Sequence, residues 1–181
     1  MRKSFTVHAR LQLALAAAAL CASAYTAVPL LPPFAHEGIL LGIGFASLLP
    51  LHAATIFRGI ALEFRVRGHA SDRKNQWRAL KALPHRVRVL LVALGLAGGV
   101  LLSGVFSEDS GLQATDAYRG RYYAVDTTDP QRPNIQVTRT EYEALSKQGQ
   151  RTMFAIYGLI ATAGGAVTLV YGKLDTWAVR S

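Results

Sequence analysis

Cysteine is almost absent from this sequence, because Cys21 is the only one among 181 residues. A single thiol cannot form an intramolecular disulfide or supply a metal site that needs several thiolates. The sequence also lacks a phosphate-binding glycine loop, a nucleophile paired with a base, and histidines at metal-ligand spacing. We therefore expect no catalytic residues, no metal and no cofactor.

Charged residues are absent from four long stretches, which cover residues 11–31, 38–57, 89–106 and 153–172. An α-helix of about 20 apolar residues crosses the roughly 30 Å of hydrocarbon in a bilayer. Lipid also favours helices, because a helix satisfies its own backbone hydrogen bonds. The fold class that we predict is an all-α membrane protein, a bundle of four transmembrane helices.

Acidic residues are few: 11 stand against 20 Lys and Arg, and the formal net charge is +9. In a soluble protein this balance suggests nucleic-acid binding, but here cations gather in the leader 1–10, the loop 58–88 and the tail 173–181. The positive-inside rule places these segments in the cytoplasm and residues 107–152 outside. Abundant Ala, Gly and Arg are typical of GC-rich bacterial genomes. We predict a multi-pass protein of the bacterial plasma membrane, with both termini cytoplasmic and no nucleic-acid partner.

The first stretch, 11–31, also has features of a secretory signal. The tripeptide Ala-Ser-Ala at 22–24 is an acceptable cleavage site after a short apolar region. The apolar run nevertheless continues to Leu31, which makes it long enough to span a membrane. We expect an uncleaved signal anchor; the alternative is a mature chain that begins at Tyr25 and keeps three spans.

Pro50 interrupts the second stretch, and His52 follows it closely. Proline removes one hydrogen bond from a helix, which predicts a kink at this point. His52 is the one histidine inside the four stretches. We expect it to hydrogen-bond a neighbouring helix rather than to bind haem.

The basic loop 58–88 contains a short amphipathic pattern over residues 72–83. Ser71 is placed to cap this helix, and Pro84 ends it. Apolar residues share one side of the helix and cations the other, which is typical of a helix at a membrane interface; a solvated connector is the alternative. The side chains expected at anionic lipid headgroups are Arg58, Arg65, Lys74, Trp77, Arg78 and Lys81.

Small residues recur four positions apart in three of the stretches, and this spacing allows helices to approach closely. We expect these residues to pack the helices of one chain together, and homo-oligomerisation is the alternative. They are Gly38, Gly42, Gly95, Gly99, Ala161 and Gly165.

The segment 107–152 predicts a small ββα unit between the third and fourth spans. We expect a flexible lead-in up to Ala117, followed by strands at 121–126 and 135–137. The turn between the strands contains Asp129-Pro130 and Arg132-Pro133. Thr140 and Glu143 match a capping box, so a helix is expected from Glu141 toward the fourth span. The unit is too small to bury a core by itself.

Tyrosine and arginine are concentrated in this exterior unit, and such a composition suits a protein-binding surface. The alternative is that the tyrosines join the strands to the helix. The candidate partner-binding residues are Arg119, Arg121, Tyr122, Tyr123 and Tyr142.

The sequence LLPLHAATIFRGIALEFR at 48–65, followed by Trp77 and Arg78, resembles a helix end in the haem-free subunit of bacterial cytochrome bd quinol oxidases. The shared pattern R-G-x-A-x-E-F-R comprises Arg58, Gly59, Ala61, Glu63, Phe64 and Arg65. The resemblance implies an accessory subunit of a respiratory oxidase. That family is longer and has more spans. In the residues alone, Glu63 is placed to pair with Arg67 at i+4.

These patterns favour a non-enzymatic membrane protein that binds another protein or an envelope component. An accessory subunit and a toxin-immunity protein are the two forms that we consider. A transporter or channel component is the competing class, but no Asp, Glu, Lys or Arg lies inside the four stretches. Asp126 and Asp129 are expected to form turns rather than a catalytic pair.

Overall fold

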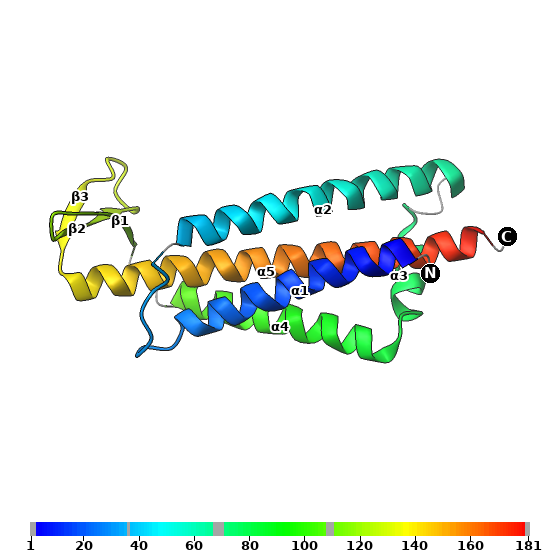
Figure 1. Ribbon diagram of the computed structural model, residues 1–181, viewed down its shortest axis with the longest axis horizontal. Helices are drawn as coiled ribbons and strands as arrows, with labels where there is room; N and C mark the ends of the chain where they lie inside the picture. Colours follow the sequence, from blue (N-terminus) through cyan, green and yellow to red (C-terminus); the bar gives the residue numbers. More distant parts are fainter. Residues whose placement is uncertain (1–2, 36, 67–70, 108–110, 180–181) are drawn as a thin grey trace.

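The computed structural model describes residues 3–35, 37–66, 71–107 and 111–179, and it is mostly helical with one small sheet (Figure 1). Helices α1, α2, α4 and α5 are long and apolar enough to cross a membrane, by length and composition. The elements in chain order are α1 (Lys3–Thr26), α2 (Glu37–Val66), α3 (Arg73–Lys81), α4 (His85–Ser107), β1 (Leu112–Tyr118), β2 (Arg121–Asp126), β3 (Asn134–Val137) and α5 (Arg139–Ala178).

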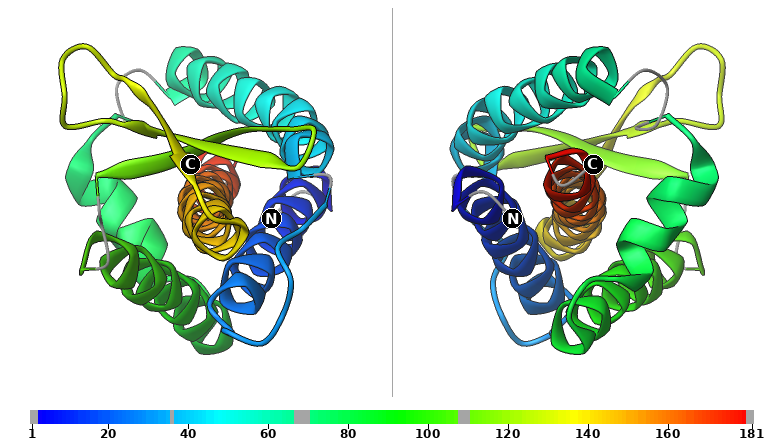
Figure 2. Two further views of the ribbon diagram at one scale, coloured as in Figure 1. Left: turned by 90° about the vertical axis from the view of Figure 1, so that its left-hand side faces the viewer. Right: turned by 90° about the vertical axis from the view of Figure 1, so that its right-hand side faces the viewer.

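Helix α5 is the centre of the bundle, and α1, α2 and α4 lie around it (Figure 2). Small residues on α5 allow α1 to pack closely along it. A Cβ added at Gly158 would lie 2.7 Å from Leu20 Cδ2, and a Cβ at Gly165 would lie 2.8 Å from Leu13 Cδ2. Ala161 between them is completely buried. The α1–α5 contact therefore depends on the absence of larger side chains at these positions.

The two ends of the bundle differ. The described ends of the chain lie at one end, together with α3, and the sheet lies at the other (Figure 1). We call them the terminal end and the sheet end.

The helices extend beyond the charge-free stretches from which they were predicted. Helix α1 begins at Lys3, inside the basic leader, and ends at Thr26 instead of Leu31. Helix α2 continues through Pro50 to Val66, and α4 begins at His85. Arg and Lys are good helix formers, so a charge that marks a membrane boundary does not end a helix.

Helix α3 has a different N-cap from the one predicted. Asp72, rather than Ser71, is the N-cap residue, and its Oδ1 accepts a hydrogen bond from the Lys74 backbone N–H at 2.9 Å. Ser71 is engaged elsewhere, because its N–H and Oγ both donate to the Glu63 carboxylate at 2.9 and 3.0 Å. Arg67, the predicted partner of Glu63, lies outside the described residues.

The segment between α4 and α5 has three strands instead of the two predicted, in the antiparallel order β1–β2–β3. Strand β1 occupies the segment that we expected to be a flexible lead-in. A two-residue turn joins β1 to β2, and both turn residues, Arg119 (φ +51) and Gly120 (φ +77), have positive φ. Positive φ at both positions is the geometry of a type I′ turn, whose twist matches that of a hairpin.

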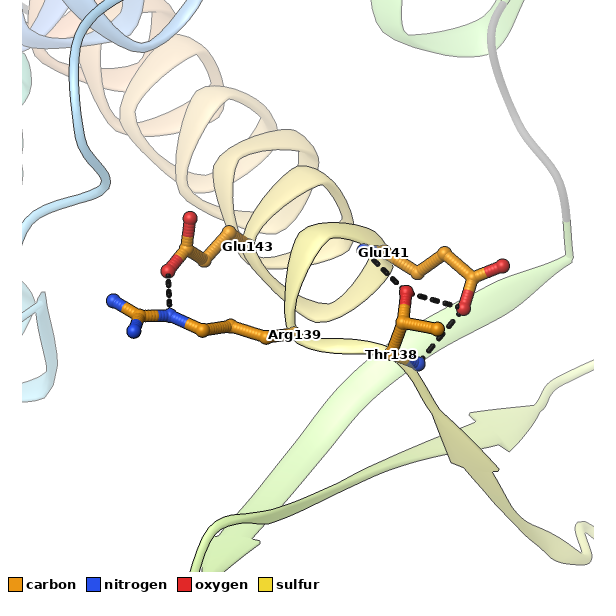
Figure 3. A network of polar contacts seen from close by, with 4 residues as sticks. All are labelled: Thr138, Arg139, Glu141 and Glu143. Carbon is orange, nitrogen blue, oxygen red and sulfur yellow. Dashed lines mark hydrogen bonds and ion pairs between the residues drawn. The ribbon is translucent and has the colours of Figure 1, made fainter.

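Helix α5 begins two residues earlier than expected and runs without a break into the fourth apolar stretch. Its N-cap is Thr138, not Thr140. Thr138 Oγ1 accepts from the Glu141 N–H at 3.2 Å, while the Glu141 carboxylate accepts from the Thr138 N–H at 2.8 Å (Figure 3). Arg139 and Glu143 add an ion pair of 2.7 Å on the first turn. These contacts fix the point where the sheet meets the bundle.

Candidate functional site

The sheet has two faces, and the candidate residues are divided between them. Successive side chains of a strand point to opposite faces, so Tyr122 and Ala124 of β2 share one face while Arg121 and Tyr123 share the other. We call these the inner face and the outer face.

The inner face attaches the sheet to the bundle. The ring centroids of Tyr122 and Tyr142 lie 5.2 Å apart, with Tyr142 on the first turns of α5. Ala124 is completely buried on the same face. Two of the five predicted partner-binding residues, Tyr122 and Tyr142, therefore contact each other.

The outer face gathers aromatic and polar side chains that the bundle does not cover. Tyr118 pairs with Arg121 across β1 and β2, and Tyr123 pairs with Gln136 across β2 and β3. Tyr118 is 64% exposed and Arg121 is exposed. A shallow cleft of about 450 Å³ lies here, between Tyr118, Tyr123 and Asn134. Tyr118 was not among the predicted residues, because the sequence pattern did not indicate that β1 is a strand.

Arg119 extends this face at the tip of the β1–β2 hairpin. Its guanidinium carbon lies 5.1 Å from the centroid of the Tyr118 ring. At this distance the positive charge is attracted to the ring face. The sheet therefore brings Arg119, Arg121 and Tyr123 together on one side, with Tyr118 added.

A second hollow lies between the loop after α1 and the first turns of α5. Its volume is about 730 Å³, and Leu30 on its rim is 95% exposed. Lys147 Nζ donates to the Val28 and Pro29 carbonyls at 3.2 and 2.8 Å, which fastens the loop to α5. The sheet end thus carries two separate concave surfaces.

Asp126 and Asp129 accept hydrogen bonds within turns. Asp126 Oδ1 accepts from the Thr128 N–H at 2.8 Å and from its hydroxyl at 2.6 Å, and these bonds lower the pKa of Asp126. Asp129 Oδ1 accepts from the Gln131 N–H at 2.8 Å. In the part of the chain that the structure describes, no group of three or more His, Cys, Asp or Glu side chains could hold a metal ion.

A polar network inside the bundle joins α1, α2 and α5, and it was not predicted from the sequence. Arg58 Nη1 lies 2.8 Å from His8 Nδ1, while His8 Nε2 lies 2.8 Å from the Leu51 carbonyl. An arginine can only donate, so His8 accepts at Nδ1 and donates from Nε2. The network was missed because α1 and α2 extend past the apolar stretches and bring His8 and Arg58 into contact.

The network continues toward the centre of the bundle. The hydroxyls of Thr55 and Thr168 lie 2.9 Å apart, and Thr168 donates to Gln12 Oε1 at 2.9 Å. His52 joins α2 to α5 at the same level, because its Nε2 lies 3.2 Å from the Ile160 carbonyl. A Cβ at Gly164 would lie 2.5 Å from His52 Nε2. This polar layer is packed tightly, which gives it a role in holding the three helices together.

The residues predicted at lipid headgroups have two kinds of surroundings. Arg58 belongs to the network, and Arg65 lies 3.6 Å from the buried Asp175 carboxylate. The remaining four are exposed on α3, where Lys81 Nζ lies 5.1 Å from the Trp77 ring centroid. These four are Lys74, Trp77, Arg78 and Lys81.

The small residues predicted to pack helices also divide into two groups. Ala161 and Gly165 lie in the α1–α5 contact. At the other four positions a Cβ would meet no atom within 4 Å, so packing among the described residues does not account for them. These positions are Gly38, Gly42, Gly95 and Gly99.

Comparison with known proteins adds no relative: no protein-family model, curated protein or solved structure matches this chain. The pattern that resembles the cytochrome bd subunit can be followed in the structure. A Cβ at Gly59 would lie 2.6 Å from the Tyr171 ring, Glu63 binds Ser71, and Phe64 is exposed. The charged residues of the pattern, Arg58, Glu63 and Arg65, all make contacts within this chain.

Proposed function

We propose that this chain is a multi-pass protein of the bacterial plasma membrane that binds another envelope protein through the outer face of its sheet. An accessory subunit and an immunity protein are the two forms of this non-enzymatic role. The observation that carries the proposal is the division of the sheet: its inner face is used for attachment to α5, while its outer face presents exposed tyrosine and arginine.

The surface of the bundle supports the membrane placement. Helices α2 and α4 turn large apolar side chains outward, among them Leu49 (67% exposed) and Leu96 (66% exposed). In water such side chains cost free energy, whereas in lipid they are favourable. Helix α3 lies at the terminal end (Figure 1) and carries Arg73, Lys74, Arg78 and Lys81, so the positive-inside rule favours a cytoplasmic position for that end.

The length of α5 supports an exterior position for the sheet. A 40-residue helix is about 60 Å long, roughly twice the thickness of the bilayer hydrocarbon. Its N-terminal part therefore extends past the membrane and carries the sheet with it. A partner outside the membrane can then reach Tyr118 and Arg121 without entering lipid.

Site-specific photo-crosslinking in native membranes tests the proposal. A photoreactive phenylalanine at Tyr118 should give one discrete cross-linked product, and the same residue at Gln131, in the distant β2–β3 turn, should not. Combined replacement of Tyr118, Arg121 and Tyr123 by Ala should remove partner recovery in mild detergent while membrane insertion persists. Undiminished recovery of the partner by the triple variant would show that the outer face is not the binding surface.

The polar network supports transport as a second candidate function. Ionisable side chains between membrane helices mark ion pathways in many membrane proteins, and His8 and Arg58 are such a pair. A proton-coupled role predicts pH-driven flux in liposomes that His8→Gln abolishes. The binding role predicts no flux from either the wild type or the variant.

A further inference from the structure

A groove lies on α5 at the terminal end, beneath α3. Figure 2 shows α3 beside α5, connecting the region where α2 ends to the start of α4. Arg73 and Trp77 of α3 line one side of this groove, and Val167, Val170 and Tyr171 of α5 line the other. Its volume is about 380 Å³. The groove is separate from the sheet and from the polar network.

The groove changes from cationic to apolar along its length. Ala79 fixes α3 against Val170 and Leu174, so α3 lies level with the last turns of α5. Val167 is one turn deeper in the bundle, about 5 Å by helical rise. The charged and indole groups therefore lie at the terminal end, and the apolar wall continues toward the middle of the bundle. This layering matches a molecule with an anionic head and an apolar tail.

The cationic end of the groove, where the anionic head of such a molecule would lie, has hydrogen-bond donors without a partner in the described part of the chain. Within the described part of the chain, the Arg73 guanidinium makes no hydrogen bond or ion pair, and the Trp77 indole N–H donates none. The surroundings are strongly basic, because Lys74, Arg78 and Lys81 are exposed on the same helix. Arginine binds phosphate oxygens through paired N–H groups, so charge complementarity favours a phosphate here.

The tail position is an apolar surface of the central helix that this chain leaves open. Val167 on α5 is 41% exposed, although α5 has the largest buried share of the four candidate spans. We propose that the groove binds one anionic phospholipid, with its phosphate on Arg73 and Trp77 and one acyl chain on Val167 and Val170. The inference rests on the proposed membrane placement, but it does not depend on a partner at the sheet.

Native mass spectrometry of the full chain in mild detergent tests this site with phosphatidylglycerol as the probe and phosphatidylcholine as the neutral comparison. The wild type should retain one phosphatidylglycerol molecule in preference to phosphatidylcholine. Arg73→Gln should weaken this binding about tenfold, because a charge-assisted hydrogen bond is lost. Arg86→Gln removes the same charge at an exposed position on α4, outside the groove, and should leave binding nearly unchanged. Equal retention of the two lipids, or equal loss in both variants, would refute a specific site.

Quenching of tryptophan fluorescence by brominated lipid tests the acyl-chain contact in a protein whose groove is unchanged. The chain has two tryptophans, so Trp177→Phe leaves Trp77 as the single fluorophore. Phosphatidylglycerol brominated on its acyl chains should quench Trp77 at a lower mole fraction than brominated phosphatidylcholine does. Val167→Trp in the mass-spectrometric assay should abolish retention. Quenching that is the same for both lipids would place Trp77 at the general lipid surface and overturn the proposal.

Discussion

Side chains that face α5 pack against other elements, whereas side chains that face away from α5 stay exposed, even where the two kinds are neighbours in the sequence. Tyr122 and Tyr123 are adjacent in β2, yet Tyr122 packs on Tyr142 while Tyr123 lines an open cleft. Gly165 and Gly42 both belong to the predicted small-residue patterns, yet only Gly165 packs against another helix. A residue's role here is decided by its direction relative to α5, and pairs of similar residues can test this.

The largest effect is expected in the α1–α5 contact. Gly158→Leu would place a side chain against Leu20 and the Ala16 carbonyl, where a Cβ alone already lies 2.7 and 3.3 Å from neighbouring atoms. We expect a loss of about 3 kcal/mol in unfolding free energy, the upper range for overpacking. Denaturant unfolding in detergent measures it. Gly42→Leu, in open space, is the matched control and should change stability little; an equal loss in both variants would refute the arrangement of the helices.

The two faces of the sheet should respond differently to the loss of a tyrosine ring. Tyr122→Ala removes the aromatic contact with α5 and should loosen the sheet by about 2 kcal/mol. Hydrogen exchange of the β2 amides measures this change. Tyr123→Ala should leave exchange nearly unchanged and weaken partner binding instead. If Tyr123→Ala loosens the sheet as much as Tyr122→Ala does, the outer face is structural and the proposed binding surface is wrong.

A smaller effect is expected at the start of α5, where the structure has Thr138 as the N-cap and the sequence pattern predicted Thr140. Thr138→Ala should destabilise the first turn by about 1 kcal/mol, the usual cost of losing an N-cap. Thr140→Ala, two residues on, serves as its control and should cost much less. Faster hydrogen exchange at the Glu141 amide is the expected readout for Thr138→Ala. The reverse order of effects would move the N-cap to the threonine that the sequence pattern suggested.

Four long apolar helices could be predicted from the sequence because absence of charge over about 20 residues is a strong signal. Their ends could not. Arg58 and His8 carry charge or polarity that the pattern assigned to a leader and a loop, yet both lie in helices that meet. A one-dimensional pattern records where lipid must begin, whereas helix ends depend on caps and tertiary contacts.

The candidate site shows the same limit. The segment between the third and fourth apolar stretches could be singled out by its tyrosine and arginine content, but β1 was missed because Arg119 and Gly120 are not among the usual hairpin signals. Without β1, Tyr118 could not be assigned to a face of the sheet. The strand register that puts Tyr122 and Tyr123 on opposite faces could not be assigned either. The residues of a surface can be listed from a sequence, while the face on which each lies requires the strand pairing.

The smallest expected effect is the pH dependence of the turn after β2. The hydrogen bonds from Thr128 stabilise the charged carboxylate, so the pKa of Asp126 in the folded protein lies below its ordinary value of 3.8. A lowered folded pKa means that the stabilisation is complete above the unfolded pKa and is lost as pH falls through the folded value. Hydrogen exchange at the Thr128 amide should therefore show protection, relative to intrinsic exchange, that holds at pH 5 and decreases below about pH 4. Asp126→Asn should remove this pH dependence, and Asp116→Asn, in a strand of the same sheet, should retain it. Protection that is unchanged down to pH 2 in the wild type would show that the carboxylate charge does not hold the turn.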